Sequence, residues 1–316
     1  FFIGADGLWG GMAAQDGDAF WRLTLHGGGN DVDPETVDAE AALRRMFGGD
    51  FPHETLNVVP WARREWVADC FQDDGLFLAG DAAHQLSPSG GFGMNTGMGD
   101  AIDLGWKLAA TIGGWGGPRL LESYEAERRP VALRNVSEAA DNFRRYDMDE
   151  ISHVEQPGAK GDAQRKALGE QFRQTLTRQT VTEGIALGYR YEKSPICVHD
   201  AETPPPDDPG IYTPSSRAGG RAPHGWLEDG RSVLDLFGDG FVLLRLGAAS
   251  PDPGPLVRAA AARDLPLNVE TRGEPDLAAL YGHALVLVRP DGHVAWRGGE
   301  APGDAAFIID TVRGAV

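Results

Sequence analysis

The stretch that decides the fold is residues 75–110, which read GLFLAGDAAHQLSPSGGFGMNTGMGDAIDLGWKLAA. An apolar run, residues 76–79, ends at Gly80 and Asp81, a glycine-rich loop follows, and a segment with helical periodicity closes the stretch. Because the run is apolar at every position, we expect a strand that is buried on both faces. A strand, a loop and a helix in this order form a site where backbone N–H groups and a helix N-terminus face a ligand. The stretch therefore predicts a ligand-binding site in an α/β fold.

The chemistry of this site depends on its carboxylate and its loop. Asp81 follows the predicted strand, at the edge where open α/β sheets bind ligands, and can accept hydrogen bonds from ligand hydroxyls; an N-cap or turn role is the alternative. The loop, residues 87–93, is rich in glycine and allows a flat ligand or a phosphate to come close. A helix is predicted from Met94, with Met98 and Ile102 on one side, and its N-terminus carries roughly half a positive charge. Spacing alone therefore supports an anion-binding or cofactor-binding loop.

Composition limits the classes of partner. The 316 residues are 41% hydrophobic and 24% charged, which is typical of a globular protein with more than one domain. The net charge is −18, from 47 acidic and 29 basic residues, which disfavours nucleic acid and anionic membranes. Cys70 and Cys197 have no metal-binding or CxxC spacing, so we expect reduced thiols in a cytoplasmic protein, with no metal site.

The residues before the central stretch are predicted to be rich in strands. Residues 19–25 alternate and carry aromatic side chains, and residues 55–59 and 61–71 are two further strand-like runs. A helix is predicted over residues 36–47, ended by Gly48. Strands mixed with one helix indicate part of an α+β sheet domain.

The opening residues carry weaker signals. Residues 2–7, Phe-Ile-Gly-Ala-Asp-Gly, could be taken for a phosphate or flavin motif, but a turn is the better interpretation. The chain begins without Met and without a charged leader region, so we expect no signal peptide and expect the true N-terminus to lie elsewhere.

Helices are predicted after the central stretch, followed by a linker. Pro118 and Pro130 are placed as first-turn prolines, and residues 163–187 are predicted to form an amphipathic helix. The charged residues within 119–129 are expected to lie in solvent. Residues 200–224 are rich in proline and cannot form a helix or a central strand.

The last part of the chain has a different pattern. Strands are predicted at residues 241–246, 267–270, 284–288 and 294–296, and helices at residues 254–264 and 303–312. A βαβ unit followed by a hairpin and a helix indicates a small α/β domain.

A resemblance to a known family sharpens this interpretation. The sequence GDAAHQLSPSGGFGMNTGMGDA resembles the second flavin-binding motif of the class A flavoprotein monooxygenases, the para-hydroxybenzoate hydroxylase-like family. The flanking residues 61–69 and 124–132 are similar as well. Residues 187–191, the proline-rich loop, and residues 219–227 and 285–297 resemble the phenol hydroxylase-like branch, in which a thioredoxin-like domain closes the chain.

The resemblance implies roles for individual residues. Asp81 would bind the ribityl chain or the pyrophosphate region of FAD, and Pro88 would lie beside the isoalloxazine ring. Gly93, Met94 and Asn95 would present backbone and amide groups to the pyrimidine edge of the ring. His84 is expected to be a structural histidine. Trp61 and Arg63 precede the motif and are candidates for facing the aromatic substrate, although sheet packing and a surface charge are the alternative.

The resemblance also implies a domain order and an activity. The implied order is part of a substrate-binding β-sheet domain (1–74), a flavin-binding strand-loop-helix (75–115), a helical segment (116–199), a linker (200–225) and a thioredoxin-like domain (226–316). The implied activity is FAD- and NAD(P)H-dependent hydroxylation of a phenolic substrate by O2, through a flavin C4a-hydroperoxide. A polyketide-tailoring hydroxylase or an epoxidase on the same scaffold is one alternative. A non-catalytic piece that serves dimerisation is another.

The chain departs from the family in three respects. The family begins with a βαβ unit containing GxGxxG, which holds the ADP half of FAD, and this chain has none. The family's Asp-Gly motif is normally followed by Arg-Ser, whereas Asp6-Gly7 is followed by Leu8-Trp9. The closing domain has no CxxC, so a structural or dimer-forming role is implied, with a homodimer as one outcome. We therefore expect the chain to be the back portion of a longer enzyme.

Overall fold

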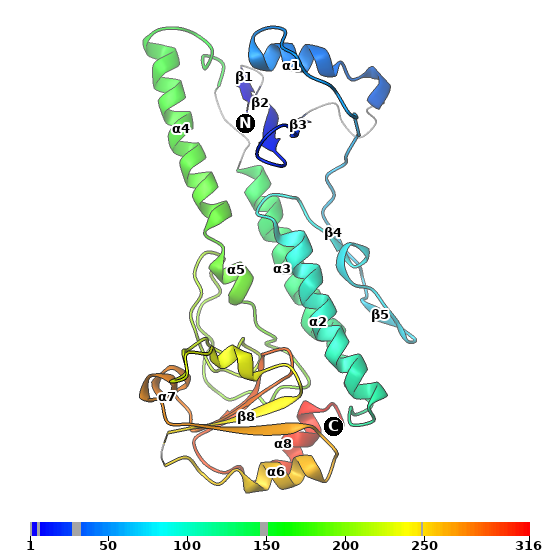
Figure 1. Ribbon diagram of the computed structural model, residues 1–316, viewed down its shortest axis with the longest axis vertical. Helices are drawn as coiled ribbons and strands as arrows, with labels where there is room; N and C mark the ends of the chain where they lie inside the picture. The colour runs from blue at the N-terminus through cyan, green and yellow to red at the C-terminus, as the bar shows by residue number, and fades with distance from the viewer. Residues whose placement is uncertain (1, 5–6, 27–32, 146–150, 248) are drawn as a thin grey trace. The chain divides into compact units, whose positions relative to one another are not determined.

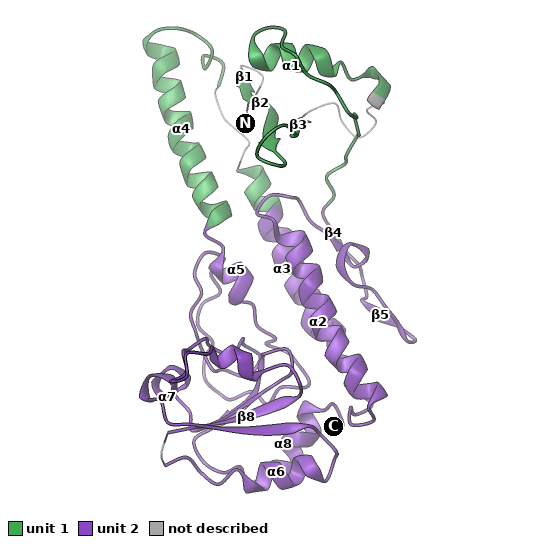
Figure 2. Ribbon diagram, in the orientation of Figure 1, with its two compact units in different colours: residues 1–64, 140–180 green, residues 65–139, 181–316 purple. Residues whose placement is uncertain are grey.

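A computed structural model describes residues 2–4, 7–26, 33–145, 151–247 and 249–316 (Figure 1). The chain divides into two compact units, one of residues 1–64 and 140–180 and the other of residues 65–139 and 181–316 (Figure 2). The five-part division expected from the sequence stays a prediction.

The first unit contains a small antiparallel sheet. Its strands are β1 (Phe2–Gly4), β2 (Gly7–Ala14) and β3 (Trp21–Leu25), in the order β1-β2-β3. The strand expected at residues 19–25 is therefore confirmed. The turn expected within residues 2–7 falls on Ala5 and Asp6, which lie outside the described residues.

Two helices complete the first unit. A 3-10 turn, η1 (Pro34–Thr36), precedes α1 (Ala39–Phe47). The Asp38 carboxylate accepts a hydrogen bond from the Ala41 amide at 2.8 Å, and Gly48, in the left-handed conformation, ends α1 as expected. The predicted helix at 163–187 is instead α4 (Ala159–Thr180) in this unit and the short α5 (Glu183–Leu187) in the other.

The strands expected at residues 55–59 and 61–71 were wrong. Only β4 (Trp66–Val67) forms there, and the apolar side chains before it are exposed, with Val59 at 73% and Trp61 at 66%. Strand-like apolar runs become strands only when a neighbouring strand accepts their backbone hydrogen bonds. No described strand pairs with residues 50–65.

Short strand pairs and two long helices surround the central stretch. β4 pairs with β7 (His84–Gln85), and β5 (Gln72–Asp73) pairs with β6 (Leu76–Phe77). Between β6 and β7 lies a 3-10 turn, η2 (Gly80–Ala82). Two helices follow, α2 (Phe92–Ile112) and α3 (Ser123–Arg144).

Two expectations about this region were wrong. The run at 76–79 is not a buried strand, since Leu76 is 75% exposed and β6 pairs only with β5 among the described strands. An apolar strand is buried only when layers cover both faces. Neither proline lies in the first turn of a helix, since Pro118 is in a turn before α3 and Pro130 is inside α3. The Pro130 ring removes one backbone donor from the helix interior, which a helix fixed by tertiary contacts can tolerate.

The C-terminal part forms a four-stranded mixed sheet. Its strands are β8 (Phe241–Leu246), β9 (Leu267–Arg272), β10 (Leu285–Val288) and β11 (Val294–Gly298), in the order β11-β10-β8-β9. β8 and β9 run parallel, and the other two pairings are antiparallel. The predicted βαβ unit, hairpin and closing helix are confirmed. The thioredoxin-like assignment stays a prediction.

Helices cover both faces of this sheet. Successive side chains along a strand point to opposite faces, so a strand with apolar side chains at successive positions needs cover on both. Leu243 and Leu287 pack on one face with α6 (Gly254–Ala261) and α8 (Ala305–Val312). Leu244 and Val286 pack on the other face with α7 (Pro275–Tyr281) and a 3-10 turn, η3 (Val233–Leu236). The sequence analysis missed α7, which has only seven residues.

Candidate functional site

The site begins at an uncapped helix N-terminus. Helix α2 starts at Phe92, two residues earlier than expected, and its N-cap is Gly91 with φ of 72°. Only glycine adopts this left-handed conformation without strain. No side chain in the described ranges caps α2. Its first N–H groups therefore keep their capacity to bind a ligand, beside the positive end of the helix dipole.

The residues proposed for the cofactor lie on the loop and on this helix end. Asp81 is exposed on η2, and Pro88 is exposed on the glycine-rich loop. Met94 is 69% exposed in the first turn of α2, and a Cβ added at Gly93 would meet no atom within 4 Å. The Asn95 side chain donates a hydrogen bond of 3.0 Å to the Gly91 carbonyl. An open face with unpaired donors fits a planar, partly anionic ligand such as a flavin.

The two substrate candidates belong to the other compact unit. Trp61 is exposed, and the Arg63 guanidinium lies 3.8 Å from the centre of the Phe143 ring. Their assignment to a substrate pocket stays a prediction.

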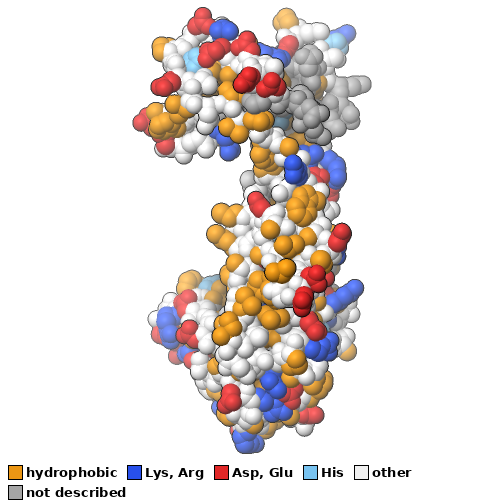
Figure 3. All heavy atoms as spheres, turned by 90° about the vertical axis from the view of Figure 1, so that its right-hand side faces the viewer, with side chains coloured by type: hydrophobic (Ala, Val, Ile, Leu, Met, Phe, Trp, Pro, Cys, Tyr) orange, Lys and Arg blue, Asp and Glu red, His pale blue; other side chains and the backbone are white. Residues whose placement is uncertain are grey.

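Helix α2 is amphipathic in an unexpected sense. Its apolar side chains Met94, Met98 and Ile102 are all more than half exposed. Figure 3 shows that exposed hydrophobic side chains are numerous on the side of the structure that lies to the right in Figure 1. Its buried side chains are mostly polar or charged: Phe92, Thr96, Asp100, Asp103, Lys107 and Ala110. Buried charges in proteins require partners, so this helix must be held by a polar network.

The first part of that network centres on Asp100. Its carboxylate accepts hydrogen bonds from the Gly80 amide at 3.0 Å, from His84 Nε2 at 2.7 Å and from Arg128 Nε at 2.8 Å. Arg128 Nη2 also donates to the Thr96 carbonyl at 3.0 Å. Asp100 therefore joins η2, β7, α2 and α3 at one buried point.

The charge of Asp100 is stabilised by these donors. Burial raises the pKa of its carboxyl, but the hydrogen bond from His84 and the charge of Arg128 outweigh burial, so the pKa lies below its usual value. His84 is fully buried, as its structural interpretation predicts.

A second network joins the helices to the C-terminal sheet. Lys107 Nζ lies 2.6 Å from carboxylate oxygens of both Asp103 and Glu127. Arg289, which follows β10, contacts the same two carboxylates at 3.0 and 2.5 Å and also reaches Asp291 at 2.6 Å. All five side chains are almost completely inaccessible to solvent.

The charges in this second network do not cancel when every group is ionised. Among these five side chains two cations face three carboxylates, and His293 Nδ1 lies 3.5 Å from the Asp291 carboxylate. Burial raises the pKa of Asp103 to about 8, against the opposing charge of Lys107, whereas the charges of Arg289 and Lys107 overcome burial and lower the pKa of Glu127. Of these two carboxyl groups, burial therefore favours the neutral form at Asp103.

The sequence analysis missed both networks. The charged residues of 119–129 were expected in solvent, yet Glu127 and Arg128 are each only 1% exposed. The available signal was the pair of charges inside the segments that carry the family resemblance, Asp100 in one and Arg128 in the other; Asp103 lies beyond them.

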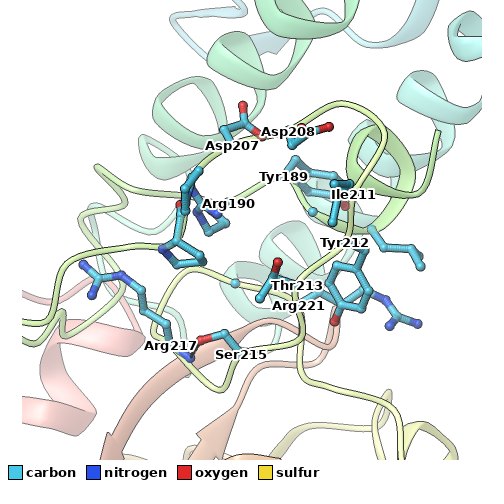
Figure 4. A pocket seen from close by; sticks show the side chains of 15 residues that line it. Tyr189, Arg190, Asp207, Asp208, Ile211, Tyr212, Thr213, Ser215, Arg217 and Arg221 are labelled. Atoms are coloured by element: carbon cyan, nitrogen blue, oxygen red, sulfur yellow. Dashed lines mark hydrogen bonds between the residues drawn. The ribbon is translucent and has the colours of Figure 1, made fainter. Parts of the chain in front are cut away.

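A separate small cavity lies away from the loop (Figure 4). It is lined by residues 187–190, 205–208, 211–213, 215, 217, 220 and 221, including three arginines. Its volume of about 20 Å³ holds roughly one water molecule. None of the proposed cofactor or substrate residues lines it, and it is too small for an aromatic substrate.

Comparisons with known proteins show which family the chain resembles. The FAD binding domain family matches residues 9–139, and the aromatic-ring hydroxylase C-terminal family matches residues 215–314. The FAD-dependent monooxygenase apdD of Emericella nidulans is 38% identical over 293 residues, which cover 85% of this chain and 46% of the relative. A putative polyketide hydroxylase of Streptomyces halstedii is 37% identical over 279 residues, covering 82% and 47%. A structure of the rebeccamycin biosynthetic enzyme RebC with reduced flavin matches with a TM-score of 0.84 and 44% identity, over 96% of this chain and 56% of that chain.

The resemblance found in the sequence is thereby confirmed, and the chain is a homologue of the class A flavoprotein monooxygenases. Its mixed α/β fold agrees with that of the RebC structure. The chain spans about half the length of the curated relatives it matches. In the described ranges, no helix has the length and hydropathy that a membrane span requires.

Proposed function

We propose that this chain supplies the second flavin-binding segment of an FAD- and NAD(P)H-dependent aromatic monooxygenase. The observation that carries the proposal is the uncapped N-terminus of α2 beside a glycine-rich loop, within a region that matches the FAD binding domain family. FAD, once reduced by NAD(P)H, supplies the activation of O2 that hydroxylation of an aromatic ring requires. The chain's own residues bind and orient that cofactor.

Each residue has a distinct task in this proposal. The Asp81 carboxylate accepts hydrogen bonds from hydroxyls of the ribityl chain, and Pro88 borders the ring. The backbone of Gly93 and Met94 and the amide of Asn95 face the pyrimidine edge. The positive end of α2 stabilises negative charge at that edge, as a preorganised dipole does without having to reorient.

The proposed substrate is a phenolic ring within a larger polycyclic or polyketide-derived molecule. The similarity to a protein named as a putative polyketide hydroxylase supports this class. Trp61 and Arg63 are the proposed contacts with that substrate. Faster turnover of simple phenols in the measurement below would indicate hydroxylation of a simple phenol. A product that carries an epoxide would indicate epoxidation on the same scaffold.

The remaining parts of the proposal concern assembly and location. We propose that residues 226–316 form a thioredoxin-like domain with a structural role, which the order β11-β10-β8-β9 supports. We propose a cytoplasmic protein, which agrees with its free thiols. A homodimer is the proposed assembly.

The test uses the protein expressed from its complete reading frame. We expect a yellow protein with bound FAD, and Asp81→Ala and Asn95→Ala should retain less FAD after gel filtration. Asp73→Ala is the matched control, because Asp73 is also an exposed aspartate, in the neighbouring strand β5. NAD(P)H oxidation and product formation should be faster with polycyclic phenols than with simple phenols.

Three results would contradict the proposal. A colourless protein that does not bind added FAD would favour a non-catalytic dimerisation module. Full FAD retention in both variants would remove the residue assignments. Faster turnover of simple phenols would overturn the substrate class.

A further inference from the structure

We propose that Arg128 is a positioning residue for the proposed cofactor site, where it sets the orientation of the N-terminus of α2 relative to η2. The inference rests on the proposed function, because it concerns the same cofactor site. Arg128 lies on α3 and does not belong to the exposed face that would meet the cofactor. It would act only through the residues that it holds.

The turn η2 and the helix α2 approach each other so closely that their backbones are in contact. A Cβ added at Gly97 of α2 would lie 3.1 Å from the Cα of Gly80, so no side chain fits between them. The link between the two segments at this point is the Asp100 carboxylate, which accepts from the Gly80 amide. The position of Asp100 therefore sets how η2, with Asp81, sits against the first turns of α2.

Arg128 fixes Asp100 and α2 with one planar group. Its Nε donates to Asp100, and its Nη2 donates to the Thr96 carbonyl in the second turn of α2. The Nη1 atom donates to the Tyr191 hydroxyl at 3.3 Å. A guanidinium presents these donors in a fixed fork, which a lysine ammonium does not reproduce. The side chain is only 1% exposed, so water does not replace a lost bond easily.

The helix leaves room for this guanidinium. A Cβ added at Gly99 would lie 2.7 Å from Arg128 Nη2 and 3.1 Å from Cζ. Any side chain at Gly99 must therefore displace the guanidinium. Gly99→Ala therefore displaces the Arg128 guanidinium without removing a charge or a hydrogen-bonding group.

The test compares Arg128→Lys and Gly99→Ala with Arg134→Lys in the flavin-loaded enzyme. Arg134 is the matched control, because it lies on the same helix and also makes a two-pronged bond, to Asp207, with a further bond to the Gly184 carbonyl. The readouts are the FAD dissociation constant, the two-electron midpoint potential of the bound flavin, and the melting temperature. The first two depend on how the helix end faces the cofactor, whereas a purely structural residue would change only the third.

We expect the FAD dissociation constant to rise about tenfold or more in both Arg128→Lys and Gly99→Ala. We expect the midpoint potential to become more negative, because a misaligned helix end stabilises the reduced flavin anion less. Arg134→Lys should leave both quantities near those of the wild type, even at an equal loss in melting temperature. An unchanged dissociation constant and potential in Gly99→Ala, or equal changes in Arg134→Lys, would overturn the inference. A wild-type protein that does not bind FAD would instead overturn the proposed function.

Discussion

Arg289 and Glu127 are separated by 162 positions in the sequence, yet their side chains form a two-pronged ion pair with N–O distances of 2.5 and 2.9 Å. Neither side chain is accessible to solvent. The Ser194 hydroxyl donates to the same carboxylate. This pair ties helix α3 to the C-terminal sheet through charge rather than through apolar contact, and it makes the stability of the two parts interdependent.

Removing the positive charge of Arg289 should therefore lower the stability of the fold. We expect Arg289→Met to lower the free energy of unfolding by about 3 to 5 kcal/mol, because the carboxylates stay buried without their partner. Arg263→Met is the control, since Arg263 makes an equally short pair with Asp310 at a site where both side chains are about one-fifth exposed. That change should cost about 1 kcal/mol or less. Urea unfolding of both variants measures the difference, and equal losses would contradict the buried-network interpretation.

The raised pKa of Asp103 predicts a pH dependence of stability. Its pKa is about 8 in the folded protein, above the ordinary value of 3.8. Between these values unfolding releases a proton, so this group makes the protein less stable as the pH rises, with no further change above its folded pKa. Asp103→Asn should flatten this slope in urea unfolding measured from pH 5 to pH 9. A slope that is the same in the wild type and the variant would contradict the raised pKa of Asp103.

Asp100 should show the opposite dependence. Because its pKa in the folded protein is lowered, its carboxylate contributes stability above its ordinary pKa, and this contribution is lost as the pH falls through the folded value. The wild type should therefore exceed Asp100→Asn in melting temperature at neutral pH, and the difference should shrink in acid. A difference that grows on acidification would contradict the assignment.

Two glycines on α2 should respond in opposite ways to the same substitution. Gly97→Ala places a Cβ against the Gly80 backbone and should lower the free energy of unfolding by about 1 to 3 kcal/mol. Gly105→Ala meets nothing within 4 Å and should raise it by up to about 1 kcal/mol, since alanine favours the helix. Thermal unfolding measures both changes. An unchanged stability in Gly97→Ala would mean that η2 can move away from α2 without loss of stability.

The two thiols should differ strongly in reactivity. Burial raises the pKa of Cys197 to about 11, whereas Cys70 is exposed. We expect a thiol reagent at pH 8 to modify Cys70 in the native protein and Cys197 only after unfolding, because the thiolate is the reactive form. Mass spectrometry of the labelled peptides identifies the modified residue. Rapid native labelling of Cys197 would show that the Arg289 network opens readily.

The C-terminal sheet was predictable because its two central strands, β8 and β10, are largely apolar runs. Phe241–Leu246 forms the strand expected from its sequence. The loop and the start of α2 were also recognisable, through glycine content and the family resemblance. Helix α7 is too short for periodicity to detect.

The polar networks were not predictable by the same means. Periodicity analysis places apolar side chains inside, whereas α2 buries Asp100, Asp103 and Lys107 and exposes Met98 and Ile102. The partners that make this possible lie on α3 and after β10, and no local pattern indicates them. The run at 76–79 failed for a related reason, since its hydrophobicity indicates burial but not what would cover it.

The inverted amphipathicity of α2 fixes its rotation about its own axis. Apolar side chains on a buried face can exchange places when a helix turns, at a modest loss in packing. A buried face of carboxylates and an ammonium cannot, because any other rotation would leave ions without partners. Helix α2 thus has a single rotational setting, and the direction in which its first backbone N–H groups point is set by side chains up to four turns further along the helix.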